Sequence, residues 1–201
     1  MHRLQMVSEV RAKSPTASVR RDANTPMLFT QIRQPDTNYL AVPEVSSQNR
    51  RYIPIGYLTP ETICSNKLYV IPDASLYLFG ILTSNVHMAW MRVVCGRLKS
   101  DYSYSPAVYN NFPWPNPSDE QKIKIEQTAQ AILNTRALYP KASLADLYDE
   151  LTMPLELRKA HQANDRAVMQ AYGFSVKDMS EADCVAELMK MYQELVNQQT
   201  K

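Results

Sequence analysis

Glycine is scarce in this sequence, with four glycines against thirteen prolines in 201 residues. Loops that cradle a phosphate or a dinucleotide need several glycines close together, because their backbone N–H groups must approach the ligand closely. No stretch of this chain offers such a cluster. The sequence therefore argues against an enzyme that binds a nucleoside cofactor by itself.

Cysteine is also scarce, and long apolar runs are absent. Cys64, Cys95 and Cys184 are widely spaced and form no C-x-x-C pair, so neither a disulfide framework nor a zinc site is indicated. No run of about 18 apolar residues occurs, and the N-terminus lacks the apolar core of a signal peptide. We expect a cytoplasmic protein with reduced thiols and no membrane partner.

The small net charge of +2 is unevenly distributed. Residues 1–118 contain twelve Lys and Arg against seven Asp and Glu, a net charge of +5. Residues 119–201 contain ten against thirteen, a net charge of −3. We therefore expect the first half, and not the second, to meet an anionic partner.

Proline-broken β-type runs dominate the first half after a basic N-terminal segment. Residues 1–26 have a weak helical pattern and are predicted to be a linker or helix from a longer parent chain. The runs at 39–45, 52–57 and 68–72 each contain a proline, which cannot donate to a strand ladder. They predict a small, irregular, twisted sheet. Residues 76–82 fit a buried strand or a short helix, of which we favour the helix, and 109–112 are predicted to be a last strand.

Helix signals dominate the second half, after the proline cluster at 113–117. Ser118-x-x-Gln121 is a capping box, and Ser143, Pro154 and Ser180 each precede a further amphipathic segment. We predict helices to about residue 138, over 143–150, over 155–172 and from 180 onward, forming an α-helical bundle. The fold class is α+β, with a recognition domain at 27–117 and a helical domain at 118–201.

Residues 84–105 are the most informative stretch of the chain. Ser84 or Asn85 can cap a helix that we predict to run to about Leu98. On that helix Asn85, Arg92, Gly96 and Lys99 would share one narrow stripe opposite an apolar face. The stretch therefore predicts a mostly buried helix with a thin basic seam, followed by a polar loop rich in hydroxyl groups.

Two clusters in the positive half carry the residue types that bind nucleic acids. Arg, Lys, Ser and Tyr hydrogen-bond to phosphate oxygens, and Gln, Asn and Arg form bidentate contacts with base edges. The predicted DNA-backbone contacts are Arg92, Arg97, Lys99, Ser100, Tyr102 and Tyr104. The base-reading candidates are Ser47, Gln48, Asn49, Arg50, Arg51 and His87, although His87 fits a half-buried structural histidine equally well.

A search for catalytic motifs assigns no catalytic or metal-binding residue. The segment 111–114, Asn-Phe-Pro-Trp, partly matches the N-P-P-[YF] loop of amino-methyltransferases, but its second position is Phe112 rather than proline. The histidines are too dispersed for a metal site, and His161 with Asn164 fits a hydrogen-bonded pair in the core. The chain by itself carries no catalytic motif.

The long motifs of this chain resemble the MmeI-like (type IIL) restriction–modification enzymes, in their target-recognition and C-terminal helical regions. The matching segments are residues 39–57, 82–92, 96–105, 109–115, 153–161 and 165–173. The resemblance implies a bacterial parent with an upstream endonuclease and an adenine-N6 DNA methyltransferase that uses S-adenosylmethionine. It also implies Mg as a cofactor of the parent, and a fold similar to the recognition domains of type I specificity subunits.

We therefore expect a module that recognises double-stranded DNA, in the major groove, for the methyltransferase and endonuclease domains of the parent chain. No cofactor is expected in this part of it. Two alternatives remain: a protein-interaction module whose basic face is incidental, and a small methyltransferase in its own right. Salt-dependent DNA binding and direct binding of S-adenosylmethionine would separate the three.

Overall fold

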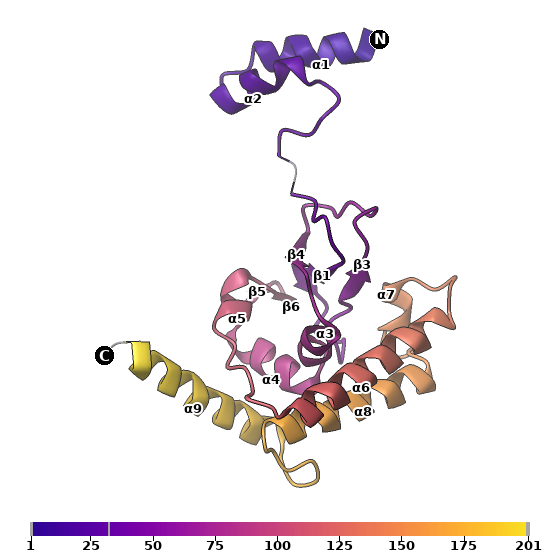
Figure 1. The fold of residues 1–201 in the computed structure, drawn as a ribbon, viewed down its shortest axis with the longest axis vertical. Coiled ribbons are helices and arrows are strands. Elements are labelled where there is room, and N and C mark those ends of the chain that lie inside the picture. The colour runs from indigo at the N-terminus through magenta and orange to yellow at the C-terminus, as the bar shows by residue number, and fades with distance from the viewer. Residues whose placement is uncertain (1, 32, 200–201) are drawn as a thin grey trace. The chain divides into compact units, whose positions relative to one another are not determined.

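The computed structural model describes residues 2–31 and 33–199 (Figure 1). These residues form two compact units, Met1–Pro35 and Asp36–Lys201. The first unit extends beyond the segment 1–26 predicted as a separate linker or helix. The predicted recognition domain from residue 36 and the predicted helical domain fall into the same second unit.

The first unit is a short helical hairpin. Helix α1 (His2–Ala12) is followed by α2 (Ala17–Arg21) and a 3-10 turn, η1 (Asp22–Asn24). Arg11 of α1 holds the turn, because its guanidinium donates to the backbone carbonyls of Asp22, Thr25 and Leu28. The helical pattern predicted for this segment is therefore confirmed.

Two three-stranded antiparallel sheets form the β part of the second unit. In the first, β1 (Tyr39–Pro43) lies between β3 (Gly56–Leu58) and β4 (Leu68–Pro72). In the second, β6 (Asp101–Ser103) lies between β2 (Val45–Ser46) and β5 (Gly96–Leu98). Strands β1 and β4 both end at a proline, as the missing ladder donor requires. The predicted α+β class with a small, irregular sheet is confirmed.

Helices α3 (Leu76–Leu82) and α4 (Asn85–Val94) lead from the first sheet to the second. Each starts at a serine whose hydroxyl accepts a backbone N–H: Ser75 from Leu78 and Ser84 from His87. The helix predicted over 76–82 is thus confirmed. The prediction that the second helix continues to Leu98 is wrong, because Cys95 is extended and Gly96 pairs with Ser103 in the second sheet.

The strand predicted at 109–112 is also wrong. Residues 106–110 form helix α5 (Pro106–Asn110), with Pro106 at its start. Proline suits the first turn of a helix, because its fixed φ is helical and its missing N–H is not needed there. The Ser-Pro pair at 105–106 was the sequence signal for this helix.

Four further helices complete the second unit: α6 (Asp119–Ala137), α7 (Leu144–Leu147), α8 (Leu155–Ala171) and α9 (Glu181–Gln199). Capping boxes at Ser118 and Ser143 start α6 and α7, and Ser180 exchanges hydrogen bonds with Asp183 at the start of α9. Gly173, with φ of 73°, ends α8 in the left-handed conformation. The helices predicted for this half are confirmed.

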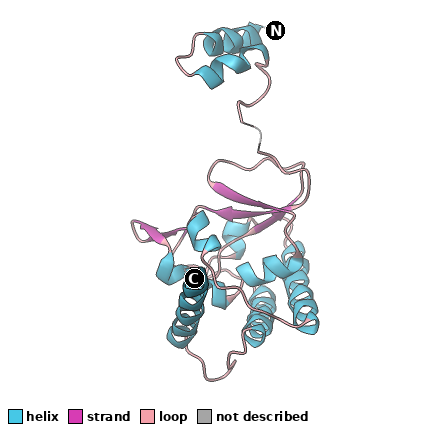
Figure 2. Ribbon diagram, turned by 60° about the vertical axis from the view of Figure 1, so that its left-hand side comes forward, coloured by secondary structure: helices cyan, strands magenta, loops and turns pink. Residues whose placement is uncertain are grey.

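The two halves of the second unit share one core (Figures 1 and 2). Helix α6 packs against α8, α3 packs on α6, and α4 contacts both α8 and α9. Figure 2 shows the strands towards one end of this unit and the long helices towards the other. Among the described helices, none combines the length and apolar character that crossing a membrane requires.

Gly80 of α3 faces α6 and α8 with no room for a side chain. A Cβ at this position would lie 2.6 Å from Ile125 Cγ2 and 3.1 Å from Asn164 Oδ1. Gly80→Ala should therefore lower the free energy of unfolding by about 1–3 kcal/mol through overpacking. Urea denaturation with an unchanged m-value would measure the loss. Gly56→Ala is the control, because its new Cβ would have no neighbour closer than 3.6 Å. Equal stability of both variants would contradict the prediction.

Candidate nucleic-acid interface

The second sheet brings the two predicted clusters side by side. Strand β2 pairs with β6 through Val45 with Ser103 and Ser46 with Tyr102. The reading loop, residues 47–51, follows β2, whereas the hairpin, residues 96–103, contains β5 and β6. The backbone N–H of Gln48 lies 3.3 Å from Asp101 Oδ1 of the hairpin. The pairing of β2 with β6 therefore places the reading loop beside the tip of the hairpin.

The tip of the hairpin presents its polar side chains to solvent. Lys99 and Ser100 form a tight turn between β5 and β6, with Lys99 at a φ of 57°. The Arg97 guanidinium lies 3.9 Å from the centre of the Tyr102 ring and donates to the Ser100 carbonyl at 3.0 Å. The polar residues exposed on the loop and hairpin are Gln48, Asn49, Arg51, Arg97, Lys99 and Ser100, with Ser47 and Arg50 partly exposed.

An ion pair that the sequence did not reveal borders the same sheet. Lys67 Nζ lies 3.0 Å from a carboxylate oxygen of Glu44, and the Glu44 N–H donates to the Lys67 carbonyl. The Glu44 carbonyl in turn accepts the N–H of Tyr104, next to β6. Glu44 and Lys67 are 23 residues apart, so no local pattern announces their pairing. We call the reading loop, the exposed hairpin tip and this pair the sheet-edge surface.

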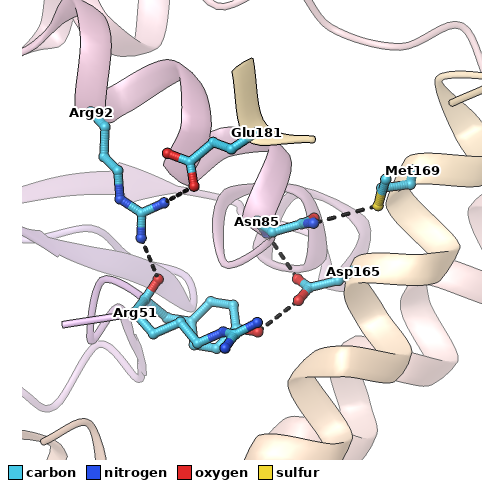
Figure 3. Close-up of polar contacts among 7 residues, drawn as sticks. Arg51, Asn85, Arg92, Asp165, Met169 and Glu181 are labelled. Atoms are coloured by element: carbon cyan, nitrogen blue, oxygen red, sulfur yellow. Dashed lines mark hydrogen bonds and ion pairs between the residues drawn. The ribbon is translucent and has the colours of Figure 1, made fainter. Parts of the chain in front are cut away.

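The residues of the predicted basic seam that lie on α4, Asn85 and Arg92, are only partly exposed. Arg92 forms an ion pair of 2.6 Å with Glu181 of α9 and donates to the Arg51 carbonyl at 3.3 Å (Figure 3). The Asn85 N–H donates to Asp165 of α8 at 2.8 Å. Arg92 is thus held by Glu181 and by the reading loop, and its predicted contact with DNA stays a prediction.

His87, Tyr102 and Tyr104 lie beneath the sheet-edge surface rather than on it. His87 has no exposed surface, and its Nε2 lies 3.0 Å from the Tyr104 hydroxyl. Burial lowers the pKa of His87 to about 4, so its ring is neutral at pH 7. Tyr102 and Tyr104 are also buried. Their predicted contacts with DNA are wrong for this structure, because their side chains are enclosed by the protein.

The segment that resembled a methyltransferase loop is part of the core. Phe112 packs edge-on against His87 and Trp114, with ring centres 5.0 and 5.1 Å away. The Tyr172 hydroxyl donates to the Pro113 carbonyl at 2.8 Å, which ties the segment to the end of α8. Its role here is packing. In the described part of the chain, no group of three His, Cys, Asp or Glu side chains could hold a metal ion.

The end of the reading loop is fastened to α8 through Tyr52. Its hydroxyl donates to Asp165 at 2.6 Å, and its ring stacks on His161 with centres 4.1 Å apart. Burial raises the pKa of Asp165 to about 6, against the hydrogen bonds from Tyr52 and Asn85. Burial, with the nearby Arg136, lowers the pKa of His161 to about 3. Both groups therefore sit in a water-poor environment.

His161 and Asn164 are both buried, as predicted, but they use different partners. His161 Nε2 lies 2.7 Å from the Tyr148 hydroxyl. Asn164 accepts from Thr128 at 3.0 Å and donates to the Gly80 carbonyl at 2.7 Å. The two residues are thus not paired with each other. His161 connects α8 to Tyr148 at the end of α7, and Asn164 connects α8 to α3 and α6.

Two family models cover nearly the whole chain. The MmeI target recognition domain matches residues 1–116, and the MmeI C-terminal domain matches residues 117–200. The chain belongs to the MmeI family. The resemblance predicted from the sequence motifs is confirmed, and the chain consists of the target recognition and C-terminal domains of this family.

Individual relatives of the MmeI family agree with this assignment. DNA methyltransferase A of Bacillus subtilis (strain 168) is 42% identical over 195 residues, which are 96% of this chain and 22% of that protein. A structure of the type IIL restriction–modification enzyme MmeI in complex with DNA is 48% identical and has a TM-score of 0.86. That match covers 98% of this chain and 26% of the MmeI chain. The chain thus spans about a quarter of the length of these relatives.

Proposed function

We propose that this chain recognises a specific sequence of double-stranded DNA and thereby selects the site on which a restriction–modification enzyme acts. The observation that carries the proposal is the pairing of β2 with β6, which places the reading loop beside the cationic hairpin tip. The two clusters are separate in the sequence and form one surface in the fold. A single DNA segment could contact both at once.

The chemistry of the sheet-edge surface suits duplex DNA. The major groove admits a two-stranded β-ribbon, and the tip of the hairpin extends beyond the residues of β6 that pair with β2. Arg97, Lys99 and Ser100 supply the cations and the hydroxyl group that bind phosphates. Gln48, Asn49 and Arg50 are of the types that form bidentate contacts with adenine or guanine. Arg92, His87, Tyr102 and Tyr104 support these elements from within.

The relatives support a division of labour within a longer polypeptide. One is named a DNA methyltransferase, and the other was solved with DNA bound. In this proposal the present chain selects the site, in the cytoplasm. The upstream methyltransferase and endonuclease domains then perform the chemistry with S-adenosylmethionine and Mg. We assign no cofactor to residues of this chain.

Arg50→Ala tests whether the reading loop contacts bases. We expect the variant to lose its preference at one base pair, with a cost of about 1–3 kcal/mol if the contact is bidentate. Selection of bound duplexes from a randomised library, followed by sequencing, would measure the preference at every position. Lys190→Ala is the control, because it removes one positive charge from α9, where Lys190 pairs with Glu187. An unchanged preference in Arg50→Ala would remove Arg50 from the base-reading residues.

Two direct measurements separate this function from the alternatives. The wild-type chain should bind duplex DNA with an affinity that falls steeply as salt increases, because cations on the protein replace counterions on the phosphates. A protein-interaction module with an incidental basic face would show no such binding. A small methyltransferase would bind S-adenosylmethionine in a calorimetric titration of this chain, whereas we expect no heat of binding.

A further inference from the structure

We propose that helices α8 and α9 set the conformation of the reading loop, so that Asp165, His161 and Glu181 act as positioning residues for DNA sequence preference. None of the three belongs to the sheet-edge surface. The inference rests on the proposed function, because it concerns how the reading loop of that function is held. It assigns a part in site selection to the C-terminal domain.

The first connection fixes the residue that directly follows the loop. His161 and Asp165 are four residues apart on α8 and therefore project from the same face of the helix. Tyr52 stacks on the first at 4.1 Å and donates to the second at 2.6 Å. Asp165 also accepts the N–H of Asn85 at 2.8 Å, which fixes its carboxylate at the start of α4. Tyr52 is thus held by its ring and by its hydroxyl.

The second connection fixes the last residue of the loop. The Arg51 carbonyl accepts from the Arg92 guanidinium at 3.3 Å. The same guanidinium is paired with Glu181 at 2.6 Å, at the start of α9 (Figure 3). The Arg92 side chain is 24% exposed and the Glu181 side chain 55%, so only the Arg92 end of the pair is shielded from water. Glu181 thus reaches the loop backbone through Arg92.

Both connections border one polar cavity of about 450 Å³. Its lining residues are Arg51, Tyr52, Asn85, Met88, Arg92 and Glu181. The backbone around Arg51 therefore borders this cavity. It is held by the hydrogen bonds of the two connections and by the packing of the Tyr52 ring. Loss of one contact should allow the loop to shift without unfolding the domain, because the surrounding core remains packed.

A shift of the loop would change base contacts more than phosphate contacts. Bidentate hydrogen bonds to a base edge require close alignment, whereas attraction between a cation and phosphates is tolerant of position. Disturbing either connection should therefore relax sequence preference at the base pairs that the loop reads. The slope of affinity against salt should stay the same, because Arg97 and Lys99 remain in place.

Tyr52→Phe and Glu181→Gln test the two connections, with selection from a randomised duplex library as the readout. Tyr52→Phe keeps the ring on His161 and removes only the hydroxyl, and we expect preference to fall by about fivefold or more at one or two base pairs. Glu181→Gln should act in the same direction. Asp165→Asn should retain most of the preference, because an amide can accept from Asn85 and donate to the Tyr52 oxygen. Glu187→Gln on α9 is the matched control.

Four outcomes are distinct. Relaxed preference in Tyr52→Phe or Glu181→Gln, at constant salt slope and with preference retained in Asp165→Asn, supports the inference. A purely structural role would reduce the folded fraction and weaken binding to all duplexes by one common factor, which overturns it. Wild-type preference in both test variants also overturns it, while leaving the proposed function intact. If the wild-type chain selects no sequence, the proposed function fails and the inference fails with it.

Discussion

Trp90→Ala should lower the free energy of unfolding by about 3–5 kcal/mol, as for other large aromatic residues in cores. Trp90 is 1% exposed and belongs to the shared core of the second unit. Its ring contacts Phe112 and Tyr192, and its Nε1 donates to the Val108 carbonyl at 3.0 Å. Alanine would leave a large cavity and an unpaired carbonyl. Urea denaturation followed by circular dichroism would measure the loss.

Trp90→Phe separates the two causes of this effect. Phenylalanine keeps most of the buried ring volume but cannot donate to Val108, so we expect a smaller loss than in the alanine variant. A loss below about 1 kcal/mol in Trp90→Ala would show that the site collapses around the missing ring.

The double variant Arg97→Ala with Lys99→Ala should weaken binding to duplex DNA by about thirtyfold at 0.15 M salt. Each phosphate contact contributes about 0.9 to the slope of log affinity against log salt concentration, so two lost contacts lower the slope by about 1.8. Both side chains are exposed at the hairpin tip, and we expect the folded state to tolerate their removal. Fluorescence anisotropy over a series of salt concentrations would measure both quantities.

The matched control removes two cations from the helical half of the chain. Lys122 pairs with Asp119 on α6, and Lys190 pairs with Glu187 on α9. Lys122→Ala with Lys190→Ala changes the net charge by the same amount and should leave the slope nearly unchanged. Equal effects of the two double variants would mean that net charge alone drives binding. The hairpin would then have no special part in it.

Local signals in the sequence were sufficient for most helices. Each of Ser75, Ser84, Ser118 and Ser143 accepts a backbone N–H at the start of a helix. Such caps depend on a few neighbouring residues, so they can be recognised without the fold. The same holds for the proline-limited strands β1 and β4.

The hairpin was not predicted because only one of the two pairings of β6 is local: β6 pairs with the adjacent β5 and with the distant β2. The apolar spacing after Trp90 permits a longer helix, and α4 ends where Gly96 can join β6. That sheet also requires β2, which lies about fifty residues earlier in the chain. A helical pattern gives no information about a strand partner at that distance.

The sequence predicted only part of the candidate site, because several of its residues depend on partners that are distant in the sequence. The reading loop and the tip residues Arg97, Lys99 and Ser100 could be identified as candidates from their residue types alone. In the fold, each of these residues is partly or fully exposed. The burial of His87 depends on Tyr104 and Phe112, and the pairing of Arg92 depends on Glu181, 89 residues away. These partners are visible only in the folded chain.

The late position of α8 in the sequence has a consequence for synthesis. Tyr52 and Asp165 are 113 residues apart, and Asn164 bonds a carbonyl 84 residues earlier. While the ribosome makes the chain, the β part and α3 therefore emerge long before the helix that completes their core. Such distant contacts slow folding and expose apolar surface to aggregation. We expect the second unit to fold late on the ribosome, after residue 171 has left the exit tunnel. The β part should not fold first and separately from the later helices.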